Sequence, residues 1–248
     1  AQAPVRTNRL FILGDVPVPY SGNIYPDGHN NHRGAWPCDG YYGELDGTWT
    51  DVTVNQTSGN VRNHNVPGDG RFDQSFFPSD LELGVGRVDF SGIDIKFNSW
   101  QERYRYYLDK NHAFRQAQFV PLRRGIVDDN FGNFAEGFGK NGFRNFTGFF
   151  GADSVTNGNY RNRLTNASYL WSYGCGGGSF TSASGIINNN PLANDSLQTV
   201  FTLLFGSYFG APYCCPAPSS PTPGRAALTG TSFTWDKATI SATARSSP

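Results

Sequence analysis

The chain contains no methionine, few cysteines and no long apolar run, and each absence narrows what the protein can be. A chain without methionine even at position 1 is expected to be processed or cut from a longer one. Four cysteines in 248 residues are too few for a disulfide framework. The longest apolar runs, such as 200–205, are far too short to span a bilayer.

Net charge is also lacking, because twenty basic residues balance twenty acidic ones. Nothing in the composition therefore points to a nucleic acid or to an anionic membrane surface as a partner. Aromatic residues, at 15%, and thirty glycines are abundant instead. We expect a core built from Phe and Tyr, with long and tightly turning connections in place of a helical bundle.

Short apolar runs and one helical repeat predict the secondary structure. We predict strands at 9–13, 81–88, 124–128, 143–150 and 169–173, and helices at 99–117 and 133–141. The apolar stretch 197–205 fits a helix or a strand, and 20–79 is a long irregular excursion rich in Gly, Asn and Asp. Alternating strands and helices predict an α/β fold, with a mostly parallel sheet flanked by helices on both faces.

The composition changes after residue 210, so we expect one α/β domain over 1–210, incomplete at its N-terminus, and a separate tail over 211–248. Pro, Ser and Thr fill this tail, which is typical of a linker. We favour a frameshift near residue 210, because the codons of 224–243 can encode a more protein-like sequence in another frame. The nucleotide sequence decides between the two, since an uninterrupted reading frame would exclude the frameshift.

Three unusual segments follow predicted strands, at the strand ends where parallel sheets bind ligands. They are Gly14-Asp15, Asp128-Asp129-Asn130 and the glycine-rich run 174–178 around Cys175. Backbone N–H groups among glycines can stabilise a thiolate or an oxyanion, which suits a nucleophile. Alternatively, Cys175 is a small buried residue and the glycines serve only a tight turn.

A cysteine nucleophile needs a base, and the irregular excursion offers His29 and His32. We expect one of them to activate Cys175, with Asp15 or Asp128 orienting the imidazole. Surface or hydrogen-bonding roles are the alternative for histidines in so polar a loop.

Two acidic turns in the excursion suggest calcium. They place carboxylates around interior glycines, at Glu44, Asp46, Asp51, Asp69 and Asp73. Calcium binds six to eight oxygens on a sharply turning loop, although neither stretch matches the full EF-hand pattern. The alternative is a pair of Asx turns that bind only the backbone. No organic cofactor is predicted.

Several segments resemble an uncharacterised family of large secreted bacterial proteins that often carry C-terminal sorting domains. The resemblance spans about 9–210, and its most specific string is Tyr-Leu-Trp-Ser-Tyr-Gly-Cys-Gly-Gly-Gly at 169–178. The order of elements is more distantly similar to the gingipain-type cysteine peptidases, which implies a caspase-like three-layer sandwich. In those peptidases a His-Gly pair and a later Ala-Cys pair form the catalytic dyad. Here Cys175-Gly176 and Gly206-Ser207 stand at about those places, so the resemblance implies the fold without the dyad.

Two functions follow from these expectations. The first is a secreted or cell-surface caspase-like domain, either a cysteine hydrolase or its inactive relative, acting on protein or glycan substrates. The second is a non-catalytic surface module that binds glycans or proteins through loops stabilised by calcium.

Overall fold

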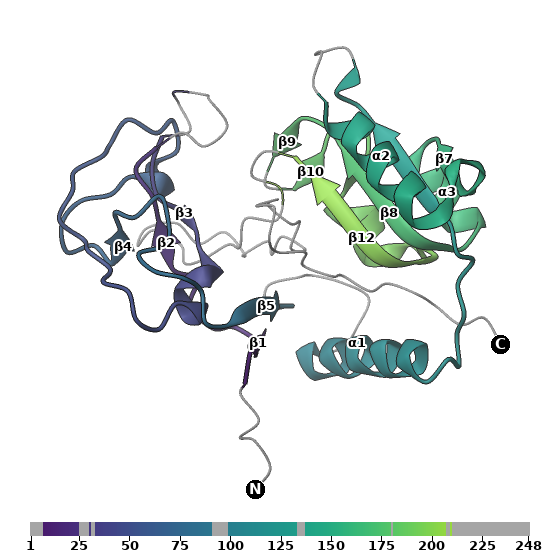
Figure 1. Ribbon diagram of the computed structural model, residues 1–248, viewed down its shortest axis with the longest axis horizontal. Helices are drawn as coiled ribbons and strands as arrows, with labels where there is room; N and C mark the ends of the chain where they lie inside the picture. Colours follow the sequence, from purple (N-terminus) through teal and green to yellow (C-terminus); the bar gives the residue numbers. More distant parts are fainter. Residues whose placement is uncertain are drawn as a thin grey trace, which may run out of the picture. The chain divides into compact units, whose positions relative to one another are not determined.

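The computed structural model describes residues 7–24, 30, 33–90, 99–132, 137–179, 181–206 and 209 (Figure 1). The chain divides into two compact units, Ala1–Asp89 and Phe90–Pro248. The first unit holds a pair of parallel strands and most of the loops, and the second holds a larger parallel sheet. The predicted domain over 1–210 stays a prediction, and the tail 211–248 lies outside the described residues.

A four-stranded parallel sheet, in the order β12-β8-β6-β7, forms the centre of the second unit. Its strands are β6 (Gly125–Asp129), β7 (Val155–Asn157), β8 (Tyr169–Cys175) and β12 (Thr199–Phe205). The apolar stretch that fits either a helix or a strand is thus the strand β12. β6 and β8 confirm the strands predicted at 124–128 and 169–173.

Helices cover both faces of this sheet. Successive side chains of a strand point to opposite faces, so neighbouring residues of β6 contact different helices. Val127 belongs to the apolar cluster that includes Phe146 of α2 (Phe138–Phe150). Its neighbour Ile126 belongs to the cluster that includes Tyr160 of α3 (Tyr160–Asn166). The prediction of a parallel sheet flanked by helices is therefore confirmed for this unit.

The prediction for 133–150 is wrong in its second half. A strand was expected at 143–150, but α2 runs through it from Phe138 to Phe150, while 133–136 lie outside the described residues. Gly142, Phe146 and Phe150 recur at helical spacing, and Phe146 is buried at 3% exposure. Gly142 has no room for a side chain, since a Cβ there would overlap the ring of Tyr173.

Helix α1 (Trp100–Arg115) confirms the helix expected at 99–117. Ser99 caps it, and its hydroxyl accepts a hydrogen bond from the backbone N–H of Glu102 at 3.2 Å. Near its other end, the ring of Phe114 meets Phe201 of β12 edge-on at 5.7 Å.

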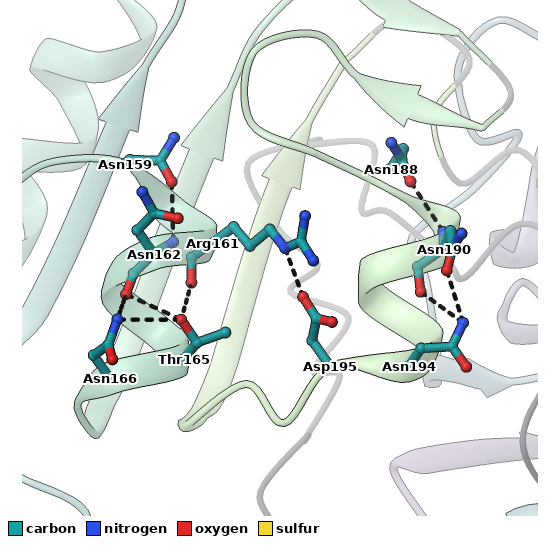
Figure 2. A network of polar contacts seen from close by, with 9 residues as sticks. All are labelled: Asn159, Arg161, Asn162, Thr165, Asn166, Asn188, Asn190, Asn194 and Asp195. Carbon is teal, nitrogen blue, oxygen red and sulfur yellow. Dashed lines mark hydrogen bonds and ion pairs between the residues drawn. The ribbon is translucent and has the colours of Figure 1, made fainter.

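A short antiparallel sheet and a fourth helix complete the second unit. They are β9 (Gly178–Ser179), β10 (Ser182–Ala183), β11 (Ile187–Asn188) and α4 (Asn189–Asn194). Figure 2 shows how asparagines cap both short helices, Asn159 at α3 and Asn188 at α4. An ion pair between Arg161 and Asp195, at 2.6 Å, joins the two helical segments.

The first unit contains two small sheets and long loops. β1 (Arg9–Leu13) pairs in parallel with β5 (Gly84–Val88), and a second sheet has the order β3-β2-β4. The strands of that sheet are β2 (Tyr20–Ser21), β3 (Trp36–Pro37) and β4 (Arg71–Phe72). The strands predicted at 9–13, 81–88, 124–128 and 169–173 were expected in one parallel sheet. They lie in two parallel sheets instead, because β1 pairs with β5 and β6 pairs with β8.

A buried arginine holds β5 to the loops of the first unit. Arg87 is 3% exposed, and its guanidinium donates two hydrogen bonds of 2.8 Å to the carboxylate of Asp39. The same guanidinium donates to the carbonyl oxygens of Val16 and Pro17. Such a bidentate pair with further acceptors leaves little of the buried charge uncompensated.

The close approach of α2 to the sheet gives a first prediction. Gly142→Ala should lower the free energy of unfolding by about 1–3 kcal/mol, because the new methyl group overlaps Tyr173. The matched control is Gly148→Ala in the same helix, where a Cβ meets nothing within 4 Å. It should raise the free energy of unfolding by about 0.5–1 kcal/mol. Urea denaturation measures both, and equal effects of the two substitutions would contradict the packing.

Candidate functional site

The carboxyl ends of β6, β8 and β12 lie side by side in the second unit. The register places Asp129 opposite Cys175, and Cys175 opposite Phe205. The sequence expectation that the acidic strand end and the cysteine strand end meet is therefore confirmed for these strands. Asp15 follows Gly14 in the first unit, where its side chain is exposed and Gly14 has a φ of 104°.

Cys175 is buried. Its exposure is 0%, and it packs in the apolar cluster with Val127, Phe146 and Tyr173. The thiol donates a hydrogen bond to Oδ1 of Asp129 at 3.4 Å. Burial raises the pKa of Cys175 to about 12, and the carboxylates of Asp129 and Asp128 add to this rise. A hydrogen bond with Tyr173 acts in the opposite direction on the Cys175 pKa, but it does not prevail. This environment favours a neutral thiol.

Asp129 is the carboxylate beside the thiol, whereas Asp128, which was predicted to orient a histidine, points to the other face of the sheet. Adjacent residues of a strand point to opposite faces, so only Asp129 shares a face with Cys175. The carboxylate of Asp128 lies on the α3 face and accepts a hydrogen bond from the backbone N–H of Tyr160 at 2.7 Å. Burial raises the pKa of Asp128. Strand alternation could have separated the two aspartates, because Val127 and Asp129 share the face that Tyr173 and Cys175 use.

Two of the glycines around Cys175, Gly174 and Gly176, are required by close packing of the chain against itself. A Cβ at Gly174 would overlap Ile186, and one at Gly176 would overlap the carbonyl oxygen of Ser184. Asn130 fastens the same segment, because its amide Nδ2 donates to that carbonyl oxygen at 2.8 Å. Gly185 has a φ of 75° and lies against the Asn130 side chain. Residues 176–179 and 181–186 therefore occupy the strand ends where a ligand was expected.

The two histidines expected to act as the base, His29 and His32, lie outside the described residues. The pairing of either with Cys175 stays a prediction. Among the histidines that are described, Nε2 of His64 lies 3.0 Å from the carbonyl oxygen of Ser58. His112 lies in the last turn of α1, where a positive charge would suit the helix dipole.

In the first unit, the carboxylates of the predicted calcium site bind backbone N–H groups. The carboxylate of Asp51 accepts hydrogen bonds from the N–H groups of Gly68 and Gly70 at 3.0 and 2.9 Å. Asp69 accepts from Val66 and Arg71, and it forms an ion pair of 2.7 Å with the Arg71 side chain. Both carboxylates therefore organise the turn 66–71.

Asp73 and Glu44 act in the same way. Asp73 accepts hydrogen bonds from the hydroxyl of Thr50 and from the N–H groups of Val52 and Thr53. The buried carboxylate of Glu44 accepts from the N–H groups of Asp46 and Gly47, and from the hydroxyl of Ser79. The Ser79 bond lowers the pKa of Glu44 most strongly, and burial opposes it. For Asp73, burial acts to raise the pKa, but the hydrogen bonds from Val52, Thr50 and Thr53 together outweigh it and lower the pKa.

Across the described part of the chain, no group of three or more His, Cys, Asp or Glu side chains could hold a metal ion. Calcium binding therefore stays a prediction, and the observed bonds are those of the alternative, hydrogen-bonded Asx turns. Asp46 is the exception among the five predicted ligands, because its side chain is exposed.

Comparison with known proteins finds no match. No family model, no curated protein and no solved structure matches this chain. Within the described ranges, none of the helices combines the length and the apolar composition needed to cross a bilayer.

The hydrogen bonds of Asp73 predict a destabilised loop when its charge is removed. Asp73→Asn should lower the free energy of unfolding by about 1–3 kcal/mol, because an amide NH₂ would face hydrogen-bond donors. The control is Asp46→Asn, at an exposed side chain, which should change little. Equal denaturation midpoints of the two variants would contradict the role of Asp73.

Acid should weaken the same loop. Because the pKa values of Asp73 and Glu44 are lowered by folding, their stabilisation is complete above the ordinary values of 3.8 and 4.5. It is lost as the pH falls through the lower values of the folded protein. Asp73→Asn should therefore cost less stability at about pH 3 than at about pH 7. A cost that does not depend on pH would contradict this assignment.

Proposed function

We propose that the chain is a non-catalytic relative of the caspase-like cysteine peptidases and works as a binding module, secreted or displayed at the cell surface. The parallel sheet with helices on both faces supports the fold assignment. The family resemblance at 169–178 supports the location.

One observation carries the non-catalytic assignment, namely the state of the Cys175 thiol. A cysteine nucleophile must be a thiolate that the substrate can reach. Cys175 is 0% exposed, and burial raises its pKa to about 12. Its neighbour Asp129 is a carboxylate, which repels a thiolate and accepts a hydrogen bond from a thiol. Burial and the carboxylate of Asp129 together outweigh the opposing hydrogen bond with Tyr173 and favour the unreactive thiol.

The strand ends are also filled. In open α/β sheets a substrate lies beyond the carboxyl ends of the strands. Here residues 176–179 and 181–186 occupy that place, and the carbonyl oxygen of Ser184 accepts a hydrogen bond from the Asn130 side chain. Two of the backbone N–H groups near the thiol are used internally, since those of Gly176 and Ser184 donate to the carbonyl oxygens of Phe205 and Gly177. The first unit, with its exposed loops, remains as the region for binding.

Alkylation of single-cysteine variants tests this proposal. C38S/C214S/C215S keeps Cys175 alone, and C175S/C214S/C215S keeps the half-buried Cys38 as the matched control. At about pH 8, a pKa of about 12 leaves roughly one thiolate in ten thousand. Iodoacetamide should therefore modify Cys38 in the folded protein but Cys175 only after denaturation. Faster modification of Cys175 than of Cys38 would support a cysteine hydrolase instead.

A further inference from the structure

Two segments of the first unit lie side by side and form one surface. The N–H groups of Glu82 and Leu83 donate to the carbonyl oxygen of Gly43, and the N–H of Leu45 donates to the carboxylate of Glu82. Farther along, a Cβ at Gly47 would touch Pro78, and Trp49 lies 6.5 Å from Phe77 between ring centroids. The segments 43–49 and 77–83 thus run past each other over their whole length.

This surface is unusually apolar for an exposed loop. Leu45 is 62% exposed, Phe76 is 81% exposed and Phe77 is 41% exposed. Leu45 lies beside Glu82 at one end of the paired segments, and Phe77, adjacent to Phe76 in the chain, lies beside Trp49 at the other end. Apolar side chains exposed to this extent on paired segments mark interaction sites more often than isolated ones do. The backbone below them is fixed by the buried Glu44, whose carboxylate joins the two segments through Ser79 and Gly47. A partner would therefore meet a surface that is already ordered.

The same paired segments also carry exposed acidic residues. Asp46, Asp80 and Glu82 are exposed, and none of them forms an ion pair with any residue that the structure describes. Arg71 and Arg87 of the same unit are paired with Asp69 and Asp39. Residues 1–89 contain eleven acidic and six basic residues, and one of the basic ones, Arg9, lies against Gly84, two residues from Glu82. The excess of acidic residues makes the field of this unit negative, which attracts cations and repels anionic partners such as acidic lipids.

We infer that this surface binds a basic polypeptide segment in which lysine or arginine side chains alternate with apolar ones. We call it the acidic-apolar surface, and it consists of Leu45, Asp46, Phe76, Phe77, Asp80 and Glu82. The apolar side chains of the partner cover Leu45 and the two phenylalanines, while its cations lie beside the carboxylates. This inference deepens the proposed binding function and rests on it, because it names the class of partner.

Fluorescence anisotropy of the full chain with labelled peptides tests the inference. The probe alternates lysine with leucine, and two reference peptides replace either all lysines by glutamate or all leucines by serine. We expect the lysine–leucine peptide to bind more tightly than both. D46N/D80N/E82Q should weaken its binding about tenfold at low salt, and much less at about 0.5 M salt, where charges are screened. L45S/F76S should weaken binding at both salt concentrations.

Matched controls come from the second unit, where Phe149 is 69% exposed and Asp153 is also exposed. F149S and D153N should leave the affinity unchanged. Equal binding of the glutamate–leucine peptide, or an unchanged affinity of D46N/D80N/E82Q, would overturn the inference. So would self-association in sedimentation velocity that L45S/F76S abolishes, since the occupant would then be a second copy. Mass spectrometry of the bound peptide separates the two proposals, because cleavage dependent on Cys175 would refute the non-catalytic function and leave the binding result standing.

Discussion

The parallel register of β6 and β8 is the constraint on which the second unit depends. It sets Asp129 opposite Cys175, so that a carboxylate and a thiol share one face of the sheet beneath α2. Helix α2 reaches that face only because Gly139 and Gly142 leave room for Asp129 and Tyr173. Helix α2 lies close enough to the sheet to exclude water from the thiol. Because a thiolate loses its hydration there, burial raises the pKa of Cys175. Packing and protonation state thus have one cause.

The first unit is organised in another way. Its strands are short, and its loops are fixed by side chains that accept hydrogen bonds from backbone N–H groups. Asp51, Asp73 and Glu44 each satisfy two such groups, and Arg87 satisfies backbone carbonyl oxygens from within. Loops held by internal bonds can present exposed apolar and acidic side chains without collapsing onto them. This property makes the unit suited to binding.

The sequence predicted the helices and strands whose residue pattern is local. It did not predict features that depend on how one segment packs against another. Apolar runs located β1, β6 and β8, and helical spacing located α1. The prediction of a strand at 143–150 is wrong, because this stretch is rich in phenylalanine, which favours strands. The helical spacing of its buried residues becomes clear only when the glycines on the same face are included.

At the site, the sequence correctly predicted that the acidic end of β6 lies beside the cysteine-containing end of β8. The sequence did not identify Asp129 as the neighbour of the thiol, since register and facing are fixed only when strands pair. The predicted role of Asp128, to orient a histidine, stays a prediction. The glycines of 174–178 suggested room for a ligand. The structure fills that room with Ser184 and Ile186, which lie only a few residues later in the chain but pack by tertiary folding.

The protonation state of Cys175 is the most direct test of whether this residue is an unreactive buried thiol. The ¹³C chemical shift of its Cβ, followed through a pH titration of the folded protein, reports the thiol without any reagent or substrate. We predict no inflection in this chemical shift up to about pH 10, because burial and the carboxylate of Asp129 raise the pKa of Cys175 to about 12. An inflection below about pH 8 would contradict it, since such a thiol would be a thiolate ready for nucleophilic attack.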